Sequence, residues 1–226
     1  MKAGEPMAEK YGVVPKRFTK AWWEYFWMYY KWHTIAAVFI ILAITVTIYQ
    51  KVTAPRYDLT LTYAGGYAFT EETQSSLIKE LAPIIDDVNK DGEKLLYFSV
   101  LSLADSNDPQ YEMAMQTKLQ LALSADEAYI YILDEAQAKQ LVTDSMETCV
   151  FAPLKDWYGK DLPDGVLCAG EEGVGLPLSK NSLFEKLGIK SDNMYLLIRY
   201  APRDDQKEQL PGYKAAIKLA NKIADY

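Results

Sequence analysis

Histidine and cysteine, the side chains that most often serve nucleophilic catalysis and zinc binding, are scarce in this sequence. The one histidine, His33, stands beside a long apolar segment, and Cys149 and Cys168 belong to no CxxC motif. A Ser-His-Asp or Cys-His arrangement in the rest of the chain is therefore excluded, and so are histidine-based zinc sites. Adjacent acids such as Asp86 and Asp87 could do acid–base work, but such pairs mostly form solvated surface. The sequence thus predicts a protein that is not an enzyme.

The two cysteines also bear on the location of the protein. Cys149 and Cys168 both lie in the distal part of the chain, and two thiols can form one bridge, which is compatible with an oxidising compartment. A loop disulfide between them and a pair of buried free thiols both remain open.

A stretch of acidic and amide side chains matches the D-x-N-x-D-G opening of a calcium loop, with Gly92 at the turn position. The oxygen ligands would come from Asp87, Asn89, Asp91 and the backbone carbonyl of Glu93. The twelfth position, where a bidentate glutamate belongs, is Phe98. An Asx-rich turn between a helix and a strand needs the same residue types without any metal. The sequence is consistent with both a Ca²⁺ site and a metal-free turn. No other cofactor is predicted.

One segment is long and apolar enough to cross a membrane. Residues 34–50 contain no charge, proline or glycine, and as a helix they would cover about 26 Å of a hydrocarbon core about 30 Å thick. The segment is apolar on every face, whereas a core helix is usually amphipathic. Eight of the eleven residues from Trp22 to Trp32 are aromatic, as is typical of the headgroup level. We predict a transmembrane helix preceded by a short interfacial helix.

The charges around this segment predict its orientation. Within twenty residues of each end, four cations precede the span and two follow it, namely Lys16, Arg17, Lys20 and Lys31 before it and Lys51 and Arg56 after it. This bias favours a cytoplasmic N-terminus and an uncleaved signal anchor in the cell membrane. The predicted parts are a cytoplasmic tail with the aromatic segment (1–33), the transmembrane helix (34–50), a linker (51–55) and an extracellular domain (56–226).

Segments with the apolar periodicity of strands alternate with segments that have the periodicity of helices in the distal domain. Strands are predicted over residues 57–63, 94–103, 128–133 and 194–200, and helices over 70–85, 107–124, 135–143 and 211–224. Repeated alternation favours an α/β domain of three layers, in which helices cover both faces of a mostly parallel sheet. The net charge of -7 and the pI near 4.9 disfavour nucleic acid as a partner.

The predicted topology also indicates where a ligand would bind. Open α/β sheets place ligands at the carboxyl ends of their parallel strands. The candidate residues near those ends are Gly65, Gly66, Tyr67, Asp105, Asn107 and Asp134. An unknown small ligand is therefore expected there.

Three segments resemble parts of the first lobe of extracellular solute-binding proteins that serve ABC importers. They are the helix end and loop of residues 119–126 with the following strand AYIYILD, the segment of residues 151–156, and the Gly-Leu-Pro-Leu of residues 175–178. Only about 170 residues follow the span, which is room for one lobe. No N-terminal lipid-anchoring cysteine is present. The resemblance therefore implies a half-site or a site shared with a partner. The chain also resembles small membrane-tethered proteins of unassigned role in Gram-positive anaerobes.

Three functions follow from these observations. The first is a non-catalytic binding or adaptor domain that is anchored in the bilayer and resembles a solute-binding protein. The second is an accessory subunit of a larger membrane complex, which would contact a partner such as a permease through the transmembrane helix and the aromatic segment. The third is an envelope enzyme that uses carboxylates alone.

Overall fold

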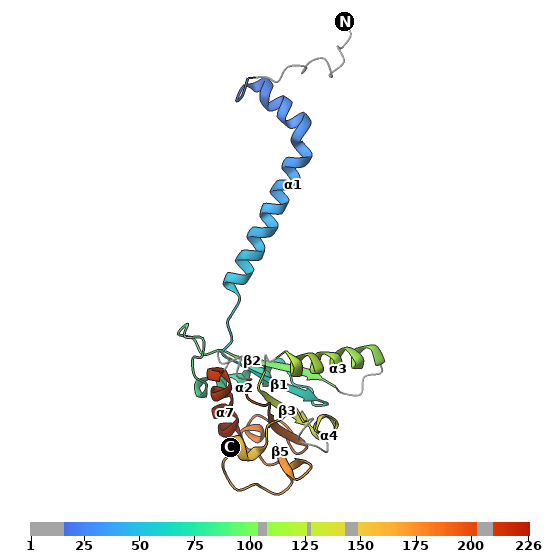
Figure 1. Ribbon diagram of the computed structural model, residues 1–226, viewed down its shortest axis with the longest axis vertical. Coiled ribbons are helices and arrows are strands. Elements are labelled where there is room, and N and C mark those ends of the chain that lie inside the picture. Colours follow the sequence, from blue (N-terminus) through green and yellow to red (C-terminus); the bar gives the residue numbers. More distant parts are fainter. Residues whose placement is uncertain (1–15, 104–107, 126–127, 143–148, 203–209) are drawn as a thin grey trace. The chain divides into compact units, whose positions relative to one another are not determined.

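A computed structural model describes residues 16–103, 108–125, 128–142, 149–202 and 210–226. The chain divides into two compact units, residues 1–55 and residues 56–226 (Figure 1). We describe each unit by itself.

The described part of the first unit is dominated by one helix, α1 (Lys20–Thr53), which is long and apolar enough to cross a membrane. The helix begins where the side chain of Thr19 accepts a hydrogen bond from the N–H of Trp22. The predicted interfacial helix and the predicted span are thus one continuous element. It also includes residues 51–53, so the predicted linker shrinks to Ala54 and Pro55.

Polar side chains within the apolar part of α1 are satisfied by the helix itself. The hydroxyl groups of Thr34, Thr45 and Thr47 each donate to the carbonyl oxygen four residues earlier, at 2.8–2.9 Å. Because hydrocarbon offers no hydrogen-bonding partner, this local pairing lets threonine stand in a spanning helix.

The second unit is built on one sheet of six strands in the order β2-β1-β3-β6-β5-β4. The strands are β1 (Leu59–Gly65), β2 (Leu96–Ser102), β3 (Ile130–Asp134), β4 (Leu167–Ala169), β5 (Glu172–Pro177) and β6 (Met194–Ile198). β1 pairs in parallel with β2 and β3, whereas the pairs β3–β6, β6–β5 and β5–β4 are antiparallel. The prediction of a mostly parallel sheet was therefore wrong. The sheet is mixed, in part because a connection as short as that between β4 and β5 can only reverse the chain.

Helices cover both faces of this sheet, as predicted (Figure 1). One face packs against α2 (Glu71–Leu81), α5 (Leu154–Trp157), α6 (Ser182–Lys186) and α7 (Leu210–Ala224). The other face packs against α3 (Pro109–Ser124) and α4 (Glu135–Leu141). A short 3-10 helix, η1 (Ala82–Ile84), follows α2. The two apolar cores meet at β1 and β3, the strands that carry the candidate site.

The amphipathic C-terminal helix is fixed to its surroundings through α6. Asn181, which is buried, donates from Nδ2 to the carbonyl oxygen of Ile223 at 2.7 Å. Its Oδ1 accepts from the N–H groups of Leu183 and Phe184, so the same side chain caps α6. One amide thus joins the beginning of α6 to the end of α7.

Candidate functional site

The carboxyl ends of β1 and β3 are joined by the side chain of Asp134. Its Oδ2 accepts a hydrogen bond from the N–H of Gly66 at 2.7 Å. Its Oδ1 accepts from the N–H of Gln137 at 3.0 Å and so caps α4. A carboxylate is suited to both tasks because it can accept several hydrogen bonds at once and favours a helix N-terminus. Asp134 therefore fixes the turn after β1 relative to the start of α4.

Tyr63 also stabilises the turn after β1. The phenol oxygen of this fully buried side chain accepts from the N–H of Tyr67 at 2.8 Å. Burial raises the pKa of Tyr63 well above its ordinary value, since a phenolate would lose its hydration there. The hydroxyl of Tyr67 in turn donates to the carbonyl oxygen of Gly188 at 3.4 Å. The predicted residues Gly66, Tyr67 and Asp134 thus lie at one end of the sheet.

Gly65, the last residue of β1, has no room for a side chain. A β-carbon there would lie 2.5 Å from the phenol oxygen of Tyr63 and 2.7 Å from Oδ2 of Asp134. Both atoms belong to groups that hold the turn, so neither can move freely. Glycine at this position permits the close approach of Tyr63 and Asp134.

Beside Asp134 the surface is hollowed into an open depression of about 460 Å³. It is lined by Asp134, Glu135, Ala136, Lys139 and Asn193. The ammonium group of Lys139 forms an ion pair with Glu135 at 2.5 Å, and this hydrogen bond raises the pKa of Lys139. The depression thus presents a half-buried carboxylate, a cation and an exposed amide.

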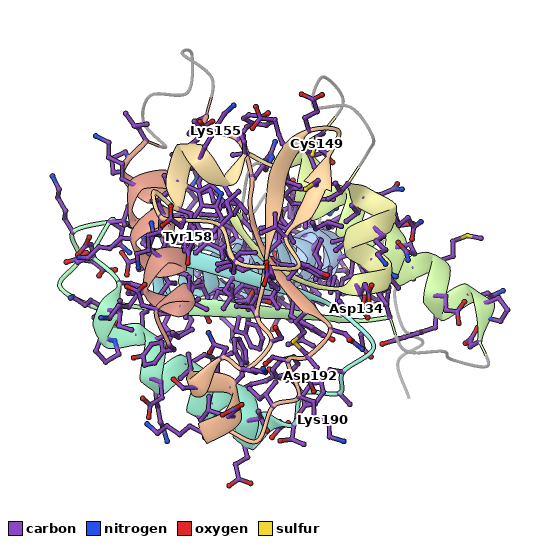
Figure 2. All side chains as sticks on the ribbon, turned by 90° about the horizontal axis from the view of Figure 1, so that it is seen from below. Asp134, Cys149, Lys155, Tyr158, Lys190 and Asp192 are labelled. Atoms are coloured by element: carbon purple, nitrogen blue, oxygen red, sulfur yellow. The ribbon has the colours of Figure 1, made fainter. Side chains whose placement is uncertain are left out.

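A second depression, of about 310 Å³, adjoins the segment that leads into β6. Its lining residues are Lys180, Glu185, Gly188, Ile189, Lys190, Ser191 and Asp192. Asp192 directly precedes Asn193, so the two depressions flank one short stretch of chain. In Figure 2, Asp134, Lys190 and Asp192 lie in one half of the view, whereas Cys149, Lys155 and Tyr158 lie in the other. The predicted residues Asp105 and Asn107 fall outside the described residues.

The loop that matches a calcium motif is closed by its own side chains. Oδ2 of Asp87 accepts from the N–H of Gly92 at 3.0 Å. Oδ1 of Asn89 accepts from the N–H of Asp91, and Oδ1 of Asp91 from the N–H of Glu93, each at 2.9 Å. These Asx turns explain the residue types without a metal. Within the described ranges no group of three or more acidic, histidine or cysteine side chains is placed to hold an ion. Calcium binding stays a prediction from the sequence.

A buried aspartate outside the predicted site residues connects this loop to the sheet. Asp58, only 9% exposed, stands just before β1. Its Oδ1 accepts from the N–H groups of Val88 and Asn89 at 2.7 and 3.1 Å, and its Oδ2 from that of Leu95 at 2.9 Å. The available signal was an acidic residue at the start of an otherwise apolar, alternating strand. Such a residue has to find donors when the strand is buried.

The two cysteines are both free thiols in the structure. Cys149 is buried and Cys168 is exposed. The disulfide that the sequence left open is therefore not formed here, and only Cys168 is accessible to reagents.

No known protein family, curated protein or solved structure matches this chain. The similarity to solute-binding proteins stays a resemblance of sequence segments.

The buried phenol of Tyr63 predicts how stability depends on alkaline pH. Tyrosine in the unfolded chain ionises near pH 10, whereas the pKa of Tyr63 in the folded chain is raised by burial. A raised pKa contributes stability below the unfolded pKa, and this stability is lost as pH rises above about 10. Urea unfolding at several pH values should therefore show a steeper alkaline loss for the wild type than for Tyr63→Phe.

The matched control for this experiment is Tyr57→Phe, because Tyr57 is 47% exposed. This variant should keep the alkaline slope of the wild type. At neutral pH, Tyr63→Phe is expected to cost about 1 kcal/mol, since the N–H of Tyr67 loses its acceptor. Equal slopes for the wild type and Tyr63→Phe would show that the phenol does not resist ionisation.

Proposed function

We propose that this chain is a non-catalytic binding module that is anchored in a membrane by α1 and holds a small polar ligand in the depression beside Asp134. The observation that carries the proposal is the position of this depression. β1 leads to β2 through α2 on one face of the sheet, whereas β3 leads into α4 on the other face. Neighbouring parallel strands whose connections leave on opposite faces leave a crevice at their carboxyl ends, where open sheets bind ligands.

The groups around the depression favour a ligand with both donors and acceptors. Asp134 offers carboxylate oxygens, Lys139 an ammonium group, and Asn193 an exposed amide. An apolar ligand would displace water from these polar groups without offering hydrogen bonds in return, and a polyanion would face the carboxylates of Asp134 and Glu135. Asp134 and Gly66 are already fixed to one another, so that part of the site is preorganised.

The test of ligand binding is a thermal-melting screen of the domain formed by residues 56–226, with a panel of small polar molecules. A ligand at about 100 times its Kd stabilises the folded state by about 2.7 kcal/mol. For a domain of this size the melting temperature then rises by about 5–10 °C. Asn193→Ala should abolish this rise without lowering the melting temperature of the free domain.

Gln120→Ala, on the exposed side of α3, is the matched control and should keep the response to the ligand. A ligand that shifts the wild type and Asn193→Ala equally would bind elsewhere. A broad panel without any shift would contradict the proposal.

The membrane anchor is supported by the aromatic half of α1. The rings of Trp22, Phe26 and Tyr30 follow one another along the helix, and that of Phe18 precedes them just before its start, with successive centroids 5.4–5.6 Å apart. Trp23 and Trp27 are exposed on a neighbouring side. Aromatic side chains that surround the end of an apolar helix suit the headgroup region of a bilayer. The cation excess before the span supports a cytoplasmic N-terminus and an extracellular domain.

The exposed thiol of Cys168 allows a direct test of this sidedness. A membrane-impermeant maleimide is expected to label the full-length protein in intact cells, because the domain would face the outside. Cys168→Ser should remove the label, since Cys149 is buried. Labelling that appears only after lysis would place the domain in the cytoplasm.

A further inference from the structure

We propose that the end of the domain opposite the candidate site rests on the lipid headgroups of the membrane that holds α1. The contact surface, called here the tyrosine patch, consists of Tyr57, Tyr97, Leu121 and Lys118. This inference rests on the proposed membrane anchor and goes beyond it, because an anchored domain need not touch the bilayer.

The tyrosine patch brings large exposed side chains together at one place on the domain surface. Tyr57 and Tyr97 are 47% and 45% exposed, and their ring centroids are 5.0 Å apart. Leu121 near the end of α3 is 64% exposed. Tyr97, Leu121 and Lys118 line a groove of about 380 Å³ between α3 and β2, a strand at the edge of the sheet. Tyrosine and leucine beside a lysine form a surface that suits an interface between hydrocarbon and anionic headgroups.

The backbone on both sides of Tyr57 is fixed to the rest of the domain. The carbonyl oxygen of Arg56 accepts a hydrogen bond from Nδ2 of Asn89 at 2.9 Å. The carboxylate of Asp58 accepts hydrogen bonds from the three backbone N–H groups described above. Because both neighbours are held by the loop of residues 86–95, the backbone that carries Tyr57 is held against the domain. A fixed surface needs no ordering before it contacts lipid.

The short segment between α1 and Tyr57 favours lipid, rather than a soluble partner, as what contacts the tyrosine patch. Only three residues, Ala54, Pro55 and Arg56, separate the last residue of α1 from Tyr57. Even a fully extended chain covers at most about 3.6 Å per residue, so Tyr57 lies within about 14 Å of the end of that helix. The headgroup layer is about 5–7 Å thick on each side of the hydrocarbon core. A tether this short keeps the tyrosine patch within reach of the headgroups at all times.

Contact at this end would leave the candidate ligand site open to solution. Tyr57 precedes β1, whereas Gly65 and Gly66 end it, and β1 has seven residues. At about 3.3 Å per residue, the two ends of the strand are about 20 Å apart. The domain would therefore rest on lipid at one end and present its depression at the other.

The test uses the full-length protein in vesicles of phosphatidylcholine and phosphatidylglycerol. In a Cys168→Ser background, Leu121→Cys is labelled with an environment-sensitive fluorophore, since Cys149 is buried. Spin-labelled lipids serve as quenchers from the membrane, and iodide serves as the quencher from water. The matched control is Asp192→Cys, at the other end of the domain. Leu42→Cys, within α1, reports on the anchor itself.

The proposal expects lipid quenching at positions 121 and 42 and iodide quenching at position 192. Quenching by lipid at position 42 alone, with iodide reaching position 121, would overturn the tyrosine patch and leave the anchor intact. Protection of position 121 from both quenchers would show a protein contact, for instance a second copy, and would also overturn it. No lipid quenching at position 42 would contradict the membrane anchor and hence the proposed function.

Discussion

Asp58→Ala is expected to lower the free energy of unfolding of the domain by about 4 kcal/mol. The substitution leaves the N–H groups of Val88, Asn89 and Leu95 without their charged acceptor. Hydrogen bonds to charged groups are worth about 1.5–3 kcal/mol each, and contributions from one network are not additive. Since domains are stable by only about 5–15 kcal/mol, this change removes a large share of the total. Urea unfolding of residues 56–226 measures it.

Two further variants show whether the carboxylate itself carries the effect. Asp58→Asn keeps one acceptor but turns an amide donor toward a backbone N–H, so we expect an intermediate loss of about 2 kcal/mol. Asn89→Ala removes two exposed hydrogen bonds of the same loop and should cost about 1 kcal/mol. If Asp58→Ala were as mild as Asn89→Ala, the buried carboxylate would not organise the loop.

Gly65→Ala is expected to cost about 3 kcal/mol and to abolish the ligand response at the same time. The added β-carbon would have to displace the buried phenol of Tyr63 and the carboxylate of Asp134. Both groups hold the turn through backbone N–H groups, those of Tyr67 and Gly66. Stability follows from urea unfolding, and the ligand response from the thermal screen.

The matched control for this prediction is Gly212→Ala at the start of α7. The nearest atom to a β-carbon there is Cε2 of Tyr129, at 4.0 Å. Because alanine restricts the unfolded chain more than glycine does, this variant should gain about 0.5 kcal/mol. A loss for Gly65→Ala no larger than the change for Gly212→Ala would refute the account of the turn.

Local signals in the sequence located most elements of the domain. Helices were predicted from residue 70 and from residues 107–109, and in the structure Thr70 and Asp108 are the N-caps. Capping depends on a few neighbouring residues, so it can be read from the sequence. β1 was predicted over 57–63 but spans 59–65, because alternation shows which face a residue occupies and not where pairing begins. α5 and α6, of four and five residues, are too short to show a helical period.

The direction of β6 could not be predicted from its own residues. The segment Met194–Ile198 is apolar and buried, as a central strand of either direction would be. Its direction depends on the whole connection from β3, which contains the hairpin of β4 and β5. Strands and helices that alternate along a chain usually form repeated parallel units, and this connection breaks the repeat.

The same error explains which residues of the candidate site were missed. Gly66 and Asp134 could be predicted because open sheets bind ligands at the carboxyl ends of their parallel strands. Asn193 precedes β6, and the amino end of an antiparallel strand lies at the same edge of the sheet. Lys139 lies on α4, five residues after Asp134, in a part of the chain where the rule makes no prediction. Once β6 is known to be antiparallel, Asn193 is found by the same reasoning.

The late position of β6 in the sequence has a consequence for the biogenesis of the domain. β3 is apolar and pairs with β1 on one side, and its other side pairs with β6, which begins sixty residues after β3 ends (134 to 194). While the chain is being made, β1, β2 and β3 can assemble with this side of β3 unpaired. An open apolar edge of this kind recruits strands from other chains. Nascent chains stalled before β6 are therefore expected to aggregate or to need a chaperone, whereas chains that include β6 pair this side of β3 themselves.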